Sequence, residues 1–157
     1  MRTFSLLKGL PVYSHDGKQL GNVVDLLVQE DGKVASIVVE GKRLFQRDTF
    51  IPIESVLSFD NDGITISSST TKYSTRQEKN THYLNTHHSL AKKFVKSENG
   101  EVLGILEDVF FQEELGTIEG YKITDGFFSD ISDGKKVIKS NDFTVNKDTI
   151  IFKAKRK

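Results

Sequence analysis

Short apolar runs, many of them β-branched, recur along the chain with polar residues between them. Such runs are VVDLLV at 23–28, VASIVVEG at 34–41, NDGITI at 61–66 and LEDVFFQ at 106–112. None continues at a period of 3.6 residues, so each indicates a strand rather than a helix. Only IPIESVLSF (51–59) and IKSNDFTV (138–145) have room for a single helical turn. The pattern therefore predicts an all-β protein made of small antiparallel barrels.

Polar turns separate these runs. HDGK (15–18), EDGK (30–33) and ENGE (98–101) place Asp-Gly or Asn-Gly between two apolar segments. These dipeptides favour a type I′ turn, in which both central residues take positive φ angles. HDGK and ENGE are each predicted to close a β-hairpin of that type, and EDGK is predicted to form a second hairpin turn in the first copy.

The whole pattern occurs twice. VYSHDGKQLGNVVDLLV begins at Val12, and VKSENGEVLGILEDVFF begins at Val95. One constant offset aligns Gly17 with Gly100, Leu20 with Leu103, Gly21 with Gly104, and Asp25 with Asp108. Two copies of this length are too few for a solenoid, so they indicate a tandem duplication. We assign the repeated glycines and aspartates a structural role.

The duplication divides the chain into domains. We expect a first barrel over 1–68, a polar linker over 69–87, a second barrel over 88–153 and a basic tail over 154–157. Domains this small have thin cores. The two barrels are therefore expected to pack against each other, as two copies of a single-barrel relative would in a homodimer. Whether the whole chain also forms a homodimer is left open.

Charge and composition narrow the function. The 157 residues contain 22 basic and 22 acidic side chains, and this balance does not support a basic surface for nucleic acid. There is no cysteine, which excludes disulfides, thiolate metal sites and cysteine nucleophiles. No apolar run approaches the length of a membrane span. The expectation is a soluble, cytoplasmic protein.

The repeated motif carries a family resemblance. Each copy has Val-x-Ser, a turn glycine, then Leu-Gly-x-[VIL]-x-Asp, and the first copy continues to FIPIESV (50–56). In this order the motifs resemble the PRC-barrel family, although KKVIKSN (135–141) replaces FIPIESV in the second copy. That family includes the cytoplasmic part of the photosynthetic reaction-centre H subunit and the C-terminal domain of the small-subunit ribosome maturation factor. The resemblance implies an adaptor barrel that contacts protein partners, with no common catalytic residue.

Asp25 and Asp108 are the residues that most suggest chemistry. With alternating side chains, each shares a strand face with apolar neighbours: Val23 and Leu27 in the first copy, Leu106 and Phe110 in the second. An acid/base pair is one hypothesis. The other is that each carboxylate accepts hydrogen bonds from backbone amides of a neighbouring turn, because a buried charge needs partners. Recurrence of the aspartate in both copies favours the structural role, so we expect no catalytic residue.

Three of the four histidines lie in the linker sequence THYLNTHH: His82, His87 and His88. On a helix they point in different directions, and on a strand His82 and His88 lie roughly 20 Å apart. No cysteine or paired aspartate is near to complete a ligand set. We expect an exposed cluster, no metal site and no other cofactor. The basic tail KAKRK is expected to be a solvated end.

A candidate partner surface follows the third predicted strand of each copy. GKRLFQRDTFIP (41–52) and DGFFSDISDGKKV (125–137) each contain two consecutive apolar residues, which point to opposite faces of a strand. One hypothesis is that they close the barrel mouth or meet between the barrels. The other is that they bind a protein partner, because aromatic side chains beside arginine are typical of interface hot spots. The residues assigned to this surface are Arg43, Phe45, Arg47, Phe127 and Phe128.

These inferences lead to one functional hypothesis and one alternative. The chain is interpreted as a non-enzymatic adaptor of two PRC-type barrels that binds a protein partner. The alternative is a ribosome- or RNA-associated factor, by analogy with the maturation factor. The balanced charge does not support that alternative.

Overall fold

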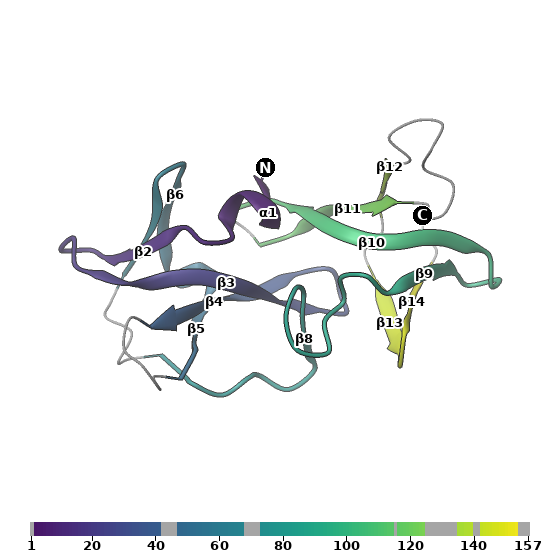
Figure 1. Ribbon diagram of the computed structural model, residues 1–157, viewed down its shortest axis with the longest axis horizontal. Coiled ribbons are helices and arrows are strands. Elements are labelled where there is room, and N and C mark those ends of the chain that lie inside the picture. Colours follow the sequence, from purple (N-terminus) through teal and green to yellow (C-terminus); the bar gives the residue numbers. More distant parts are fainter. Residues whose placement is uncertain are drawn as a thin grey trace.

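The computed structural model describes residues 2–41, 47–67, 73–114, 116–124, 135–139 and 142–153. Their regular secondary structure is almost entirely β-strand, arranged in two seven-stranded sheets, which confirms the predicted all-β class (Figure 1). No helix in this part of the chain is long and apolar enough to cross a membrane. The predicted basic tail and four candidate partner residues, Arg43, Phe45, Phe127 and Phe128, lie outside the described residues.

The two sheets repeat one topology. The first contains β2 (Pro11–Ser14), β3 (Gln19–Gln29), β4 (Val34–Gly41), β5 (Thr49–Pro52), β6 (Val56–Asp60) and β7 (Gly63–Ile66), in the order β5-β4-β3-β2-β7-β6. The second contains β9 (Phe94–Ser97), β10 (Val102–Phe111), β11 (Ile118–Thr124), β12 (Lys135–Ile138), β13 (Phe143–Asn146) and β14 (Thr149–Phe152), in the order β12-β11-β10-β9-β14-β13. Within these orders the strands pair antiparallel, except that β2 pairs parallel with β7 and β9 with β14. The sequence repeat is thus also a repeat of strand order.

Two short helical turns accompany the strands. The 3-10 turn η1 (Ile53–Ser55) lies in the first of the two segments where the sequence allowed a turn. In the second of those segments, the described residues end β12 and form β13. The helix α1 (Phe4–Leu7) was not predicted, because four residues are too few to show a helical period.

The turns that contain Asp-Gly and Asn-Gly differ from the prediction. Gly17, Gly32 and Gly100 have φ angles of 88°, 85° and 87°, but the residues before them do not have positive φ. In the first turn, Gly17 N–H donates to the Ser14 carbonyl at 2.9 Å, and Ser14 N–H donates to the Lys18 carbonyl at 2.8 Å. This is a three-residue loop in which only glycine takes the left-handed conformation, so the type I′ prediction was wrong.

The predicted strand faces also need a correction. The pairing of β3 with β4 shifts register between Val23 and Asp25, and that of β10 with β11 shifts between Leu106 and Asp108. A shift of this kind is a β-bulge, and it reverses which residues share a face. Val23 therefore packs in the main core, whereas Leu27 packs in a separate cluster. The expectation that Val23, Asp25 and Leu27 share one face was wrong, as was its counterpart in the second copy, where Leu106 packs in the main core.

The remaining two strands are exchanged between the halves. β1 (Arg2–Thr3), at the start of the first copy, pairs with β10 of the second, with Thr3 opposite Phe110. β8 (Thr81–Tyr83), in the predicted linker, pairs with β3 of the first copy, with Tyr83 opposite Leu27. Each copy thus contributes the segment that precedes it to the sheet of the other copy.

Further main-chain hydrogen bonds join the halves around the β3–β4 turn. Three amides donate across the junction: Val34 to the Gly116 carbonyl at 2.7 Å, Ile118 to the Gly32 carbonyl at 2.8 Å, and Phe143 to the Glu30 carbonyl at 2.9 Å. Main-chain bonds fix the position of one half against the other more narrowly than apolar contact alone, because they are directional. The turn EDGK is therefore part of the junction between the halves.

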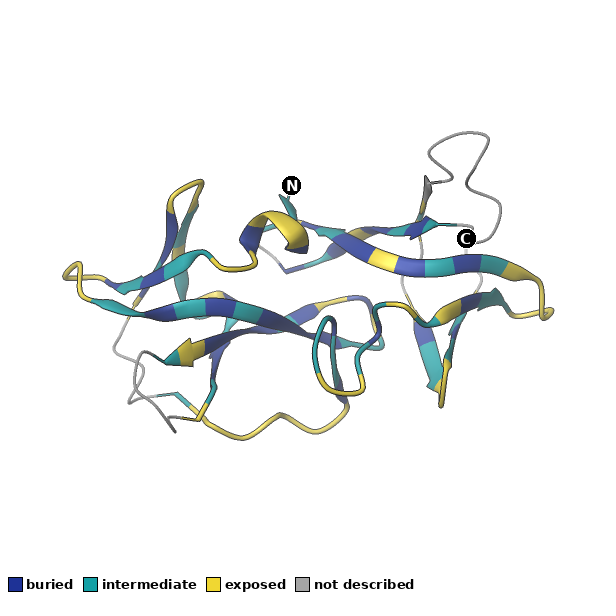
Figure 2. Cartoon of the chain, in the orientation of Figure 1, coloured by how far each residue is buried: buried dark blue, intermediate teal, exposed yellow. Residues whose placement is uncertain are grey.

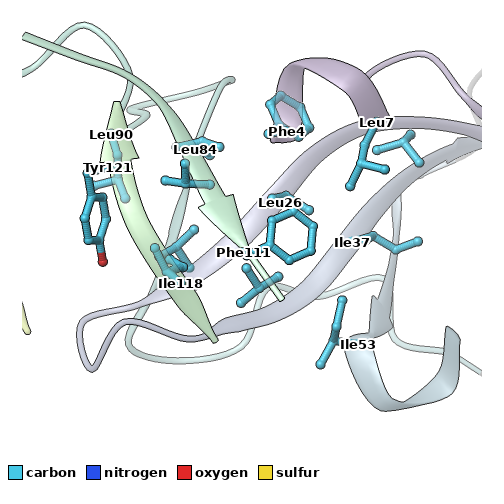
Figure 3. Close-up of a cluster of buried hydrophobic side chains, with 14 of the residues drawn as sticks. Phe4, Leu7, Leu26, Ile37, Ile53, Leu84, Leu90, Phe111, Ile118 and Tyr121 are labelled. Atoms are coloured by element: carbon cyan, nitrogen blue, oxygen red, sulfur yellow. The ribbon is translucent and has the colours of Figure 1, made fainter. Parts of the chain in front are cut away.

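The main hydrophobic core of the described residues is shared by both copies. Its side chains come from the first half, the second half and the exchanged segments, and they include Phe4, Leu7, Leu26, Ile37, Leu84, Leu90, Phe111, Ile118 and Tyr121 (Figure 3). Buried positions continue along β3 and β10 toward the centre of the elongated molecule, whereas the outer turns are exposed (Figure 2). The two copies consequently form one body.

Candidate functional site

The Asp25 carboxylate accepts several hydrogen bonds at the junction between the copies. It is completely buried on β3. Its Oδ1 accepts from the amides of Leu84 at 3.1 Å and Asn85 at 2.8 Å, while Oδ2 accepts from the Thr86 amide at 2.7 Å and from the Thr86 hydroxyl. The amide of the next residue, Leu26, donates to Oδ1 at 2.8 Å. Asp25 therefore holds the segment that leads into the second copy.

Asp108 makes the matching contacts in the other direction. Its Oδ1 accepts from the Phe4 amide at 3.1 Å and from the Val109 amide at 2.8 Å, and Oδ2 accepts from the Ser5 amide at 3.2 Å. The amides of Phe4 and Ser5 belong to the first turn of α1, whose N-cap residue Thr3 makes no side-chain cap. Asp108 supplies that cap from the opposite half, and a carboxylate at a helix N-terminus is also favoured by the helix dipole.

The four repeated glycines have two separate roles. Gly17 and Gly100 take the left-handed conformation that their turns require. Gly21 and Gly104 allow close strand approach: a Cβ atom would lie 2.1 Å from the Glu40 carbonyl oxygen at Gly21, and 2.4 Å from the Thr124 carbonyl oxygen at Gly104, which also has a positive φ of 146°. A larger residue at either of these two sites would push β3 from β4, or β10 from β11.

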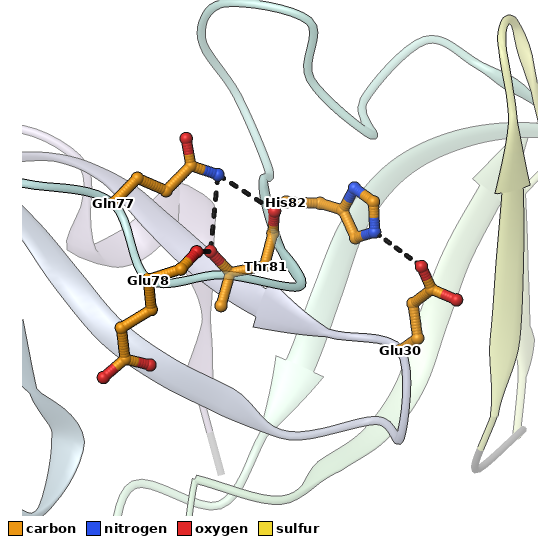
Figure 4. A network of polar contacts seen from close by, with 5 residues as sticks. All are labelled: Glu30, Gln77, Glu78, Thr81 and His82. Atoms are coloured by element: carbon orange, nitrogen blue, oxygen red, sulfur yellow. Dashed lines mark hydrogen bonds and ion pairs between the residues drawn. The ribbon is translucent and has the colours of Figure 1, made fainter.

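The three linker histidines are in separate environments. His82 Nε2 lies 2.9 Å from a Glu30 carboxylate oxygen, next to a network in which Gln77 donates to Thr81 and Thr81 donates to the Glu78 carbonyl (Figure 4). His87 stacks on Tyr83, with ring centroids 4.2 Å apart. His88 is exposed. Among the described residues, no three His, Cys, Asp or Glu side chains gather as a metal site.

Of the five residues assigned to the partner surface, the structure describes Arg47. It is exposed and lies two residues before the first residue of β5. The other four lie outside the described residues.

Sequence reasoning missed a hollow on the outer face of the second sheet. It has a volume of about 270 Å³ and is lined by Phe110, Gln112, Glu119, Gly120, Val137 and Lys139. The signal for it was present in the FF of LEDVFFQ, because two consecutive aromatic residues on a strand point to opposite faces. Phe111 is completely buried in the core, and Phe110 faces the hollow.

A second hollow of about 520 Å³ lies beside the connecting segment. His82, His88, Lys93, Val145, Lys147 and Asp148 line it. The Lys93 ammonium donates to the Lys147 carbonyl at 2.6 Å, which ties the start of the second copy to the β13–β14 turn. Neither hollow is lined by Asp25 or Asp108.

Comparison with known proteins matches both copies. The family described as PRC-barrel domain matches twice, at residues 1–72 and at residues 86–157. The chain is also 31% identical over 156 residues to the protein named "Uncharacterized protein YrrD" of Bacillus subtilis (strain 168). That alignment covers 97% of this chain and 87% of the Bacillus protein. Both repeats, and not one alone, are thus shared with these relatives.

Proposed function

Because this chain belongs to the PRC-barrel domain family in both of its halves, we propose that it is a non-enzymatic adaptor that binds a protein partner. The two barrels act as one rigid platform. Their outer surfaces carry the recognition, and the buried polar groups maintain the geometry of the platform.

The observation that carries the proposal is the set of hydrogen bonds accepted by the two repeated carboxylates, Asp25 and Asp108. A catalytic acid or base must reach a substrate proton. Asp25 and Asp108 instead accept main-chain amides from the exchanged segments, and their exposed fractions are only 0% and 5%. These groups support a structural role, which leaves surface recognition as the function that best fits the fold.

Affinity capture from a lysate of the source cell tests the proposal. The tagged full-length protein is expected to retain a defined protein partner, and nuclease treatment of the lysate is expected to leave that partner bound. Substitutions of surface residues that leave the circular dichroism spectrum unchanged should release it. Failure of the folded protein to retain any protein would contradict the adaptor role.

An RNA- or ribosome-associated role is the alternative, and one surface feature favours it. The larger hollow contains two lysines and two histidines beside one aspartate, a lining that suits a phosphate group. In this case the captured material would be lost on nuclease treatment. Charge reversal by Lys93→Glu with Lys147→Glu would also reduce the capture, whereas the same change at the exposed Lys153 would have little effect.

A further inference from the structure

The outer face of the first sheet is covered by the chain itself. Leu27, Val38 and Phe50 form a buried cluster on this face, and Tyr83 packs against it. The rings of Phe50 and Tyr83 have centroids 6.2 Å apart. At the edge of the sheet, the Phe50 amide donates to the Ser74 carbonyl at 2.9 Å. The segment between the two copies thus covers both the edge strand β5 and the apolar surface behind it.

Two of the four matching positions in the second sheet carry smaller residues. The register places Phe110 opposite Gly120, where the first sheet has Leu27 opposite Ser36. It likewise places Val137 opposite Lys122, where the first sheet has Phe50 opposite Val38. Gly120 and Val137 thus replace Ser36 and Phe50, and this change removes a hydroxymethyl group and an aromatic ring from the face.

The exchanged strand adds to the difference. Thr3 on β1 lies opposite Phe110, at the position that Tyr83 occupies opposite Leu27. Threonine cannot cover the face as a tyrosine ring does. The hollow of about 270 Å³ lies on this face, with Val137 53% exposed at its margin.

The floor of the hollow depends on Gly120. A Cβ atom there would lie 2.6 Å from Cγ1 of Val137 and 3.8 Å from Cδ2 of Phe110. Polar groups of Gln112, Glu119 and Lys139 line the hollow around this apolar floor, and all three residues are exposed. An apolar centre with a polar rim is the arrangement found around anchor residues in protein interfaces.

The edge strand next to the hollow is β12, and it occupies the same place in the second sheet as β5 does in the first. Among the described residues, β12 pairs with β11 alone, whereas its counterpart β5 also contacts Ser74 through the Phe50 amide. An extended peptide can add to such an edge through main-chain hydrogen bonds, with side chains entering pockets on one face.

We propose that the second sheet binds an extended segment of a partner protein, which adds to the edge of β12 and inserts an aromatic side chain into the hollow at Phe110, Gly120 and Val137. The proposal rests on the adaptor function and specifies its binding surface. The first sheet is the internal template, because there a segment of this chain occupies the edge and an aromatic ring covers the face. The ring supplies apolar burial, and the main-chain pairing fixes the direction of the segment.

The test uses a library of random 12-residue peptides displayed on phage and selected on the full-length protein. Val137→Phe restores the residue type that the first sheet has at this position, and it should fill the hollow. Selected peptides are expected to share an aromatic residue and to bind Val137→Phe at least tenfold more weakly than the wild type. Val102→Phe is the matched control, because Val102 lies on the same sheet, is 57% exposed and does not line the hollow. It should leave the affinity unchanged.

A second variant and a second measurement make the result decisive. Val137→Asp places a charge at the same exposed position and should likewise weaken peptide binding at least tenfold, with circular dichroism as the check on folding. Selection of no peptide, or equal binding to both Val137 variants and the wild type, would overturn the proposed surface. Capture from lysate separates this result from the adaptor role. A partner retained equally by wild type and Val137→Phe leaves the adaptor role standing without this surface, whereas no partner on the wild type contradicts the adaptor role itself.

Discussion

Asp25 and Asp108 are the same residue in two copies, but their partners lie in the opposite half of the chain. Each carboxylate binds amides of a segment that is distant in sequence and arrives through the exchange. A carboxylate in a low-dielectric interior is stable only when such donors surround it. The contribution of these two aspartates to stability therefore depends on assembly of the two halves.

Replacing these aspartates is expected to destabilise the protein unequally. Asp25→Ala leaves several amide donors unpaired in a fully buried site and should lower the free energy of unfolding by about 3 kcal/mol or more. Asp108→Ala should cost less, because Asp108 has fewer donors. Urea denaturation of both variants measures the difference.

The exposed turn residue Asp62 provides the control for these variants. Asp62→Ala should change the free energy of unfolding by no more than about 0.5 kcal/mol. Wild-type stability in Asp25→Ala would show that the amide contacts contribute nothing to the fold, contrary to the structural role.

Replacing Tyr121 is expected to raise the free energy of unfolding instead of lowering it. Its hydroxyl is buried and has no hydrogen-bond partner among the described residues. Tyr121→Phe removes this unpaired group while the ring contacts with Phe143 and Phe152 remain, so the variant should be more stable by about 1 kcal/mol at neutral pH. A loss of stability would reveal a hydrogen bond to this hydroxyl.

The alkaline limb of stability should also depend on Tyr121. Burial raises the pKa of this hydroxyl above its ordinary value, with a smaller contribution from the negative charges of Asp142 and Asp31. Because the folded pKa exceeds the unfolded value of about 10, the stability linked to the neutral form is present below about pH 10 and decreases as the pH rises above it. Between about pH 8 and about pH 11, wild type should therefore lose more stability than Tyr121→Phe, measured by urea denaturation at each pH.

Among the secondary-structure elements, the two exchanged segments, which begin at β1 and at β8, occupy equivalent places in the fold but differ in secondary structure. Leu7 follows β1 within α1, and Leu90 follows β8 in an irregular stretch, yet both side chains are buried in the shared core. Lys92 takes a positive φ of 72°, where the first copy has Gly9 with φ of 86°. The duplication has thus preserved the path of this segment while its local structure changed.

The neighbouring leucines of α1 provide a matched pair of substitutions. Leu7 is completely buried, whereas Leu6 is 67% exposed. Leu7→Ala should cost about 2–5 kcal/mol of unfolding free energy, because it leaves a cavity in the core. Leu6→Ala should cost no more than about 0.5 kcal/mol. Equal effects in thermal or urea unfolding would mean that α1 does not pack into the core.

At the scale of the whole molecule, the exchange makes each half incomplete. A fragment of residues 1–75 lacks the amides that Asp25 binds, and a fragment of residues 80–157 lacks α1, whose amides Asp108 binds. Neither fragment should show a cooperative transition near that of the intact chain. Mixed in equal amounts, they should associate and recover most of that transition, as followed by circular dichroism and size-exclusion chromatography.

Independent behaviour of the two fragments would contradict this account. Two stable monomers that each melt like the intact chain would show that the reciprocal contacts are dispensable. The control is a full-length chain cleaved once between residues 75 and 80, which should remain a single species because the contacts between the halves are unchanged.

The all-β class, the duplication and the positions of most strands could be predicted from the amino-acid sequence. Alternating apolar residues specify a strand wherever one face is buried, and the repeated Leu-Gly and Asp residues mark equivalent positions in both copies. A short motif of this kind depends on contacts close in sequence, so it is visible without the fold. The left-handed conformation of the turn glycines Gly17 and Gly100 belongs to this local class.

The exchange of β1 and β8 and the bulges beside Asp25 and Asp108 could not be predicted from the sequence, and the only signal noted for the hollow at Gly120 was the Phe110–Phe111 pair. β8 lies in a polar segment whose strand character comes from pairing with β3, a contact between residues far apart in the chain. A bulge is one extra residue in a ladder and leaves no mark in the apolar pattern, yet it moves Val23 to the face opposite Asp25. The hollow exists because different residues cover two equivalent sheet faces. Which residues lie over a face is decided by the assembled molecule, not by the strand beneath them.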